Sequence, residues 1–170
     1  MKRSSLVLSL SVLVGMSTML SAQVKDAPAN IAAAMLVKLV AFEKKVSSGG
    51  DISIYVLGAA EVAAELQKGI GKPIGNATLK SVESGDDLPG NKPSVLYVGN
   101  AAKLPAVTKY THENKILSAT GLPDLVSKGV TLGFGVGEDG KPKILLNLTT
   151  SVEEGLEWNP AIMKVATTIK

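Results

Sequence analysis

The sequence predicts a single three-layer α/β domain: a mostly parallel central sheet, helices on both of its faces, and an antiparallel hairpin near the C-terminus. Two observations favour this class. Short apolar runs rich in β-branched residues, typical of strands buried on both faces, are separated by segments whose apolar residues recur at helical spacing. Later the pattern changes to alternation on either side of a tight turn, which predicts a hairpin. The apolar runs are residues 52–57, 94–98 and 115–120, and the hairpin arms are residues 130–136 and 143–148.

The strand predicted at residues 52–57 is the element around which the others are arranged. Gly58 follows it and lets the backbone turn, and residues 59–66 are rich in alanine, glutamate and leucine, which have high helix propensity. A buried strand, a glycine and a helix form the first half of a βαβ unit.

Two further segments precede and follow this unit. Residues 31–46 predict an amphipathic helix, with Asn30 as its N-cap and the Ser-Ser-Gly-Gly run at residues 47–50 as its stop. Residues 77–83 alternate only weakly between apolar and polar side chains, which predicts a poorer strand at an edge of the sheet.

The C-terminal segment carries a helix-start signal. Asn159 is suited to an N-cap and Pro160 to the first helical position. We therefore expect a terminal helix, whose inner face would consist of Ile162, Val165, Ala166 and Ile169.

The first 22 residues predict a secretory signal peptide. Lys2 and Arg3 form a basic start, residues 6–20 are an apolar run, and small residues precede a cleavage point after Ala22. The apolar run is short for a membrane span, which needs roughly 20 residues. We expect an exported mature domain of residues 23–170 that does not itself span the membrane.

The composition narrows the classes of function. The predicted signal peptide carries two of the 18 basic residues, so 16 lysines face 15 acidic residues in the mature chain, which is close to neutral. Arg3 is the only arginine, which argues against phosphate and nucleic-acid ligands. The absence of cysteine excludes thiol chemistry and cysteine-based metal sites.

The sequence shows no catalytic or metal-binding constellation. His112 is the single histidine, and no serine or aspartate accompanies it in a known motif, so we interpret it as a solvated surface residue. The pairs Asp86–Asp87 and Glu153–Glu154 lack the spacing of a calcium loop and are interpreted as solvated charges. We expect no enzyme activity, no cofactor and no metal.

The glycines Gly133, Gly135 and Gly137 resemble a dinucleotide-binding loop only superficially. They lie within and just after a hairpin strand, rather than between a strand and a helix, so the geometry for binding phosphate is missing. We expect them instead to form a flat strand face against which another element can pack closely.

A ligand pocket, if the domain has one, should lie at the carboxyl ends of the parallel strands, where open α/β sheets bind ligands. The sequence places Gly58, Asn100, Thr120 and Gly121 there. The alternative interpretation is that these residues are turns that only close the strands.

The mature chain has a characteristic order of features: the first helix, the successive apolar strands, Leu122-Pro123 after the third strand, Gly129 opening the hairpin, and Gly155-Leu156 before the C-terminal segment. In this order of elements it resembles the YfiR family of periplasmic proteins. The resemblance implies a non-enzymatic, dimer-forming regulatory or sensory module in the periplasm. The better-known members have redox-sensitive disulfides, which the absence of cysteine excludes here.

Two functions follow from these observations. By resemblance, the protein acts by contact with an inner-membrane signalling receptor, either a diguanylate cyclase or a sensor histidine kinase. We expect an apolar contact patch on the first helix, at Phe42, or around Trp158. The alternative is a periplasmic small-molecule-binding module that uses the cleft at the carboxyl ends of the strands.

Overall fold

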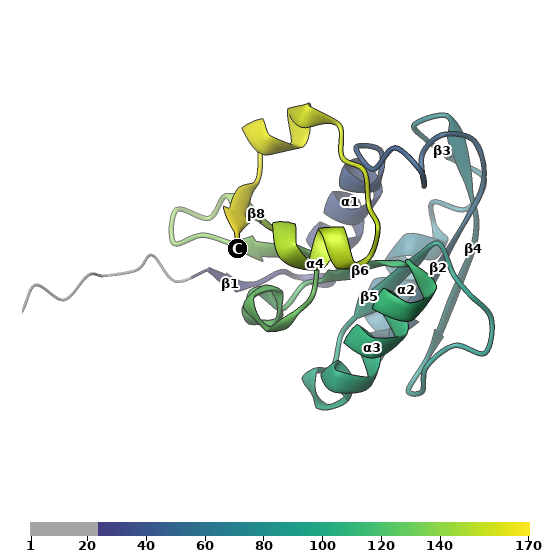
Figure 1. The fold of residues 1–170 in the computed structure, drawn as a ribbon, viewed down its shortest axis with the longest axis horizontal. Helices are drawn as coiled ribbons and strands as arrows, with labels where there is room; N and C mark the ends of the chain where they lie inside the picture. The colour runs from purple at the N-terminus through teal and green to yellow at the C-terminus, as the bar shows by residue number, and fades with distance from the viewer. Residues whose placement is uncertain (1–23) are drawn as a thin grey trace, which may run out of the picture.

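A curled, mostly parallel sheet forms the middle of the protein (Figure 1). The computed structural model describes residues 24–170, so the predicted signal peptide lies outside the described residues. Within them, the sheet has nine strands in the order β3-β4-β2-β5-β6-β7-β8-β9, and β1 pairs with β7. The strands are β1 (Lys25–Asp26), β2 (Gly50–Leu57), β3 (Pro73–Ile74), β4 (Ala77–Gly85), β5 (Val95–Val98), β6 (Leu117–Thr120), β7 (Leu132–Val136), β8 (Pro142–Asn147) and β9 (Thr167–Ile169).

Helical segments cover both faces of this sheet. The α-helices are α1 (Ala29–Val40), α2 (Ala60–Gln67), α3 (Leu104–Asn114) and α4 (Leu148–Glu153), and the 3-10 helices are η1 (Ala101–Lys103), η2 (Pro123–Lys128) and η3 (Pro160–Lys164). Side chains of α1 and α2 form one core cluster with alternate residues of β2, including Ile52 and Ile54. Side chains of α3 and η2 form a second cluster on the other face, with Leu96 and Val98 of β5. The predicted arrangement of layers is confirmed.

The strand directions also agree with the sequence prediction. Strands β4, β2, β5, β6 and β7 pair in parallel, and β8 returns antiparallel to β7 as the predicted hairpin. Strand β2 is followed by Gly58 and α2, as expected for the start of a βαβ unit. Gly58 has a φ of +67°, a left-handed conformation that glycine adopts without steric cost.

The glycine face of β7 is packed closely by other elements, as expected. A Cβ added at Gly133 would lie 2.2 Å from Cγ2 of Val126 in η2. One at Gly135 would lie 2.3 Å from Cγ1 of Val24 and 2.7 Å from the carbonyl oxygen of Lys25, beside β1. The missing side chains therefore let η2 and β1 lie directly on the strand.

The structure corrects three predictions about the elements. Helix α1 begins at Ala29, one residue before the expected cap at Asn30, and ends at Val40, because residues 41–47 turn away to contact the C-terminal segment. Strand β4 is an inner strand, since the two-residue β3 pairs with its outer side.

The third correction concerns the C-terminus, where a continuous helix was expected. Asn159 does cap a helical turn, accepting a hydrogen bond from the N–H of Ala161 at 3.0 Å. That turn, η3, ends at Lys164, and β9 then pairs in parallel with β8. The free edge of β8 supplies backbone partners for this strand, an advantage that helical spacing in the sequence does not reveal.

Candidate functional site

The two residues predicted for a partner interface, Phe42 and Trp158, come together although 116 positions separate them in the chain. The N–H of Asn159 donates to the carbonyl oxygen of Phe42 at 2.8 Å, and the backbones of Glu43 and Trp158 pair in an isolated antiparallel β-bridge. Both aromatic side chains are half-buried and pack against the core cluster of α1 and α2. The turn after α1 and the segment before η3 therefore form one surface.

A buried carboxylate, Glu43, connects the turn after α1 to the segment before η3. Its side chain is 0% exposed. Its Oε1 accepts a hydrogen bond from the N–H of Glu157 at 2.7 Å, and its Oε2 accepts one from the N–H of Val46 at 2.6 Å. Hydrogen bonds to a charged acceptor are the strong class, so this one side chain holds the turn after α1 against the C-terminal segment.

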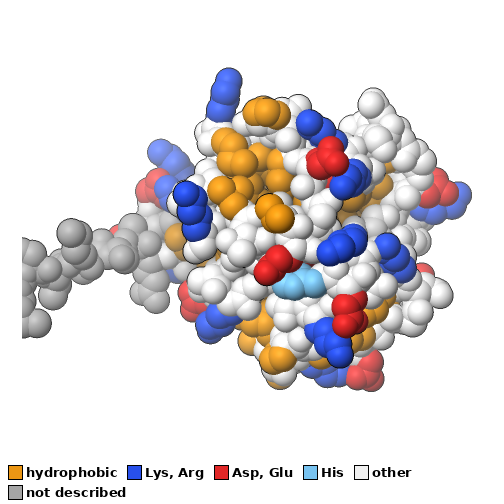
Figure 2. Space-filling view, viewed as in Figure 1, with side chains coloured by type: hydrophobic (Ala, Val, Ile, Leu, Met, Phe, Trp, Pro, Cys, Tyr) orange, Lys and Arg blue, Asp and Glu red, His pale blue; other side chains and the backbone are white. Residues whose placement is uncertain are grey.

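The C-terminal segment also carries exposed apolar side chains. Val152 is 77% exposed, Met163 45% and Val165 51%. Figure 2 shows hydrophobic side chains gathered over the region that α4, η3 and β9 occupy in Figure 1, with basic side chains at the border. We call Val152, Met163 and Val165 the C-terminal apolar surface. Exposed apolar side chains that cluster in this way are typical of protein contact sites.

The indole of Trp158 is tied to α4 behind this surface. Its Nε1–H donates to the hydroxyl of Ser151 at 2.6 Å. The hydrogen bond fixes the ring orientation and connects α4 to the segment that leads into η3.

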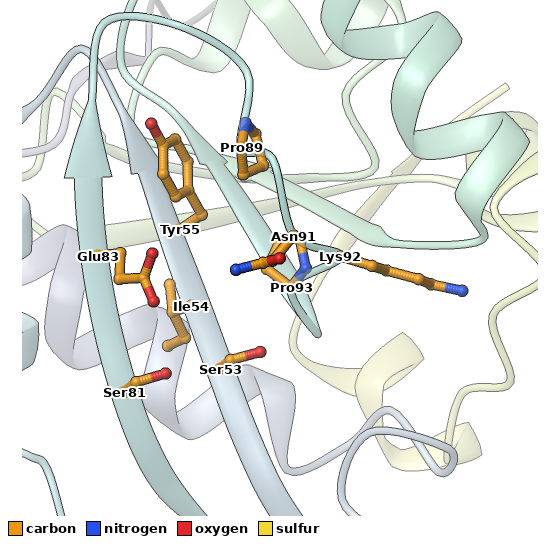
Figure 3. A pocket seen from close by; sticks show the side chains of 9 residues that line it. All are labelled: Ser53, Ile54, Tyr55, Ser81, Glu83, Pro89, Asn91, Lys92 and Pro93. Carbon is orange, nitrogen blue, oxygen red and sulfur yellow. The ribbon is translucent and has the colours of Figure 1, made fainter.

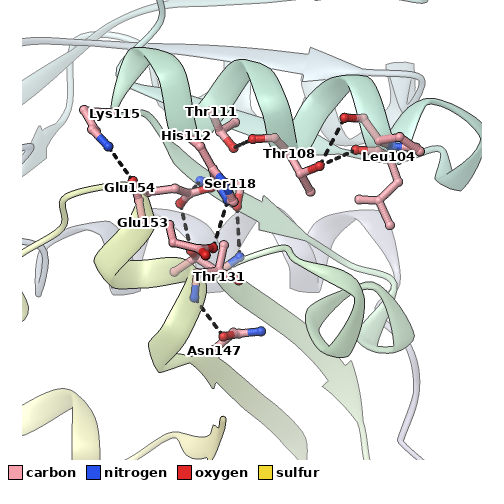
Figure 4. Close-up of polar contacts among 12 residues, drawn as sticks. Leu104, Thr108, Thr111, His112, Lys115, Ser118, Thr131, Asn147, Glu153 and Glu154 are labelled. Carbon is pink, nitrogen blue, oxygen red and sulfur yellow. Dashed lines mark hydrogen bonds and ion pairs between the residues drawn. The ribbon is translucent and has the colours of Figure 1, made fainter.

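A second buried carboxyl, Glu154, lies at the end of α4 (Figure 4). It is 0% exposed, in contrast to the prediction of a solvated charge. Its Oε2 accepts hydrogen bonds from the N–H of Ser118 at 3.0 Å and from the hydroxyl of Thr131 at 2.7 Å. Its Oε1 has no hydrogen-bond partner among the described residues.

The surroundings of Glu154 set its protonation. Burial raises the pKa of this carboxyl to about 7, and the hydrogen bonds from Ser118 and Thr131 oppose the rise. The side chain therefore joins the end of α4 to β6 and to Thr131, the residue before β7, and can take up a proton near neutral pH. Because this side chain is wholly buried in the folded protein, it cannot contact a substrate.

His112 lies beside this network rather than free in solvent. Its side chain is 31% exposed, and its Nε2 lies 3.5 Å from Oε2 of Glu153. Lys115, at the end of α3, donates from its Nζ to the carbonyl oxygen of Glu153 at 2.8 Å. These contacts connect α3 to α4 at the surface and bring no nucleophile to the histidine.

The predicted ligand residues are only partly assembled. A Cβ added at Gly58 would lie 2.9 Å from Cβ of Asn100, and both residues are exposed. Thr120 is buried: its hydroxyl donates to the carbonyl oxygen of Val98 at 2.7 Å and accepts from the N–H of Leu122 at 3.0 Å. Gly121 is also buried, and its carbonyl oxygen accepts from the N–H of Ala27 at 2.9 Å. Ligand binding at this edge stays a prediction.

Comparison with known proteins decides the family. A family model described as YfiR/HmsC-like matches residues 29–167, which is most of the chain. The chain belongs to the YfiR/HmsC-like family. Members of this family are regulatory, non-enzymatic proteins of the periplasm. A search of curated protein sequences found no match.

Two solved structures share the fold of this YfiR/HmsC-like domain. One is a conserved domain protein from Vibrio cholerae O1 biovar El Tor, with a TM-score of 0.56 and 14% identity over 85% of this chain. The other is the ABC domain in complex with L-Trp from Streptococcus pneumoniae, with a TM-score of 0.52 and 12% identity over 84% of this chain. This chain spans 60% of the length of each. Within residues 24–170, no helix is both long enough and apolar enough to cross a bilayer.

Sequence reasoning missed the two buried glutamates that organise this region. Glu43 follows an aromatic residue at the end of the apolar stripe of the first helix, and Glu154 follows another glutamate, so both resemble surface charges. The sequence carries little signal for this burial: Glu154 comes about one helical turn after Thr150 and Ser151, two small polar residues that the structure also shows to be buried.

Proposed function

We propose that this protein is a periplasmic regulator that binds the sensory region of an inner-membrane signalling receptor, a diguanylate cyclase or a sensor histidine kinase. Family membership supports the regulatory role. The C-terminal apolar surface supports contact with a protein, because Val152 of α4 and Met163 and Val165 at the end of η3 are large apolar side chains that are exposed, in a region where Figure 2 shows hydrophobic side chains gathered. This surface is the single structural observation that carries the proposal.

The mechanism is a shift between receptor states. A regulator that binds one state of a two-state receptor more tightly moves the population toward that state, by an amount set by the difference in affinity. The C-terminal apolar surface is suited to such binding because the buried Glu43 and the Trp158–Ser151 hydrogen bond hold its supporting segments in place. A preformed surface loses less entropy on binding than a mobile one.

Site-specific photo-crosslinking in cells tests the proposal. A photoreactive residue at Val165 should capture a membrane-integral sensor protein. The same residue at Ala64, which is exposed on α2 and lies outside the C-terminal apolar surface, is the matched control and should capture none. Capture of the same proteins from both positions, or of no membrane sensor from Val165, would contradict the proposal.

We also propose an alternative, a small-molecule-binding role at the carboxyl edge of the sheet. It is favoured by the exposed, adjacent positions of Gly58 and Asn100. A thermal-shift screen with a metabolite panel tests it, since a ligand at 100 times its dissociation constant adds about 2.7 kcal/mol of stability. A shift that persists unchanged in Asn100→Ala, or no shift with any metabolite, would count against this edge as the site.

A further inference from the structure

A hollow of about 50 Å³ lies over strands β2 and β4, on the face of the sheet that carries α3 (Figure 3). The loop of residues 86–93, between β4 and β5, closes it from above. The hollow is lined by Ser53, Ile54, Tyr55, Ser81, Glu83, Pro89, Asn91, Lys92 and Pro93. It is separate from the C-terminal apolar surface and from the carboxyl edge at Gly58.

Hydrogen bonds hold the walls of the hollow in place. Ser53 and Ser94 exchange two of them, each backbone N–H donating to the other's hydroxyl, at 3.2 and 3.1 Å. The hydroxyl of Tyr55 donates to the carbonyl oxygen of Asp87 at 2.8 Å, and that of Tyr110 in α3 donates to the carbonyl oxygen of Asn91 at 3.2 Å. The loop is thereby fixed to β2 and to α3, which makes the hollow preformed.

One exposed carboxylate, that of Glu83, borders the hollow. Two charged residues line it, Glu83 and Lys92, and Figure 3 shows that the Lys92 side chain extends away from the others. The carboxylate of Glu83 lies among the lining side chains, and the carboxamide of Asn91 reaches toward it. Within residues 24–170, the Glu83 carboxylate takes part in no hydrogen bond or ion pair, and Asp87 nearby is paired with Lys103.

The remaining walls suit a small organic cation. Hydroxyl and carboxamide oxygens of Ser81 and Asn91 can accept hydrogen bonds from the N–H groups of an ammonium, with Glu83 as its counter-ion. The ring of Tyr55 attracts a cation over its face, and the rings of Pro89 and Pro93 can contact a short hydrocarbon chain. We propose that this hollow binds the primary ammonium group of a small organic molecule. The bound molecule would bridge β4 and the 86–93 loop and so provide a ligand input to a regulatory protein.

An NMR titration of the mature protein tests the site with n-butylammonium as the probe. The neutral analogue n-butanol, which has nearly the same shape, is the control ligand, and ionic strength is kept constant. We expect saturable shifts of the backbone amides of Ser53, Tyr55 and Asn91 with n-butylammonium and much weaker ones with n-butanol. No saturable shift at these amides, or equal binding of the two compounds, would overturn the proposal.

A pair of variants separates the charge of Glu83 from the general acidity of the surface. Glu83→Gln keeps the shape of the side chain and should weaken n-butylammonium binding by about tenfold or more, because a charge-assisted hydrogen bond is lost. Lys92→Met removes a charge of the opposite sign and should leave binding unchanged or tighter. Thermal melting of both exposed-site variants checks that they fold. Unchanged affinity in Glu83→Gln would refute Glu83 as the counter-ion.

Discussion

The buried carboxyl of Glu154 allows a quantitative prediction for the variant Glu154→Gln. Glutamine has the same shape and stays neutral at all pH values, so it imitates the protonated carboxyl. Its amide oxygen can accept the hydrogen bonds from Ser118 and Thr131 that Oε2 accepts in the wild type. The variant therefore removes the titration of this position while preserving most of its contacts.

The expected magnitude follows from the pKa. The folded-state pKa of about 7 lies roughly 2.5 above the ordinary value of 4.5, and each pKa unit corresponds to about 1.4 kcal/mol. Because the folded state binds the proton more tightly than the unfolded state, the protein loses stability as the pH rises from 4.5 to 7. Above pH 7 the buried charge costs about 3 kcal/mol.

Urea denaturation of the mature protein at pH 5 and pH 8 measures this cost. At pH 5 the ionisation of Glu154 should lower the stability of the wild type by only about 1 kcal/mol, since the carboxyl of the folded protein is then still protonated and only that of the unfolded chain is largely ionised. At pH 8 the variant should be more stable by up to about 3 kcal/mol. The gain is smaller to the extent that the new amide N–H₂ finds no acceptor beside Thr111.

A control variant isolates the buried position from the general effect of removing a negative charge. Glu138→Gln lies in the exposed turn between β7 and β8 and should give the same small difference from the wild type at both pH values. The reasoning is refuted if Glu154→Gln differs from the wild type equally at both pH values, or is the less stable protein at pH 8. Either result would mean that folding does not raise the pKa of this carboxyl.

Three further predictions concern the packing of this region. Glu43→Ala should lower the free energy of unfolding by about 2–5 kcal/mol in urea denaturation, because two backbone N–H donors lose a buried acceptor, and unaltered stability would contradict that role. Gly133→Ala should lower the free energy of unfolding by about 1–3 kcal/mol, since the added Cβ would overlap a side chain of η2. Gly90→Ala is the matched control, because a Cβ there would have no neighbour within 4 Å. Equal melting temperatures of the two variants would contradict the close packing at Gly133. Trp158→Phe should lower the free energy of unfolding by about 1 kcal/mol more in the wild-type background than in the Ser151→Ala background, because only the wild type has the indole–hydroxyl hydrogen bond to lose. A double-mutant cycle of thermal unfolding measures the difference. Equal losses in the two backgrounds would mean that this hydrogen bond contributes nothing to stability.

Much of the fold could be predicted because local patterns reported burial directly. A strand covered on both faces is typically a nearly continuous apolar run; residues 95–98 form one, and residues 52–57 form one that only Ser53 interrupts. The hairpin of β7 and β8 was legible from alternation and a tight turn. The C-terminal segment was predicted wrongly because the spacing of Ile162, Val165 and Ile169 satisfies a helix, whereas pairing with the edge of β8 stabilises a strand.

By itself, the sequence determined the class of the fold, the succession of its central strands along the chain and the absence of thiol chemistry, because these depend on residue types and on neighbours in the chain. Only the tertiary structure decided which polar groups are buried and which surfaces face outward. Glu43 is buried by a contact with residue 157, and Glu154 by contacts with residues 118 and 131. The physical reason is that desolvation of a side chain depends on segments distant in sequence, whose approach no local pattern encodes.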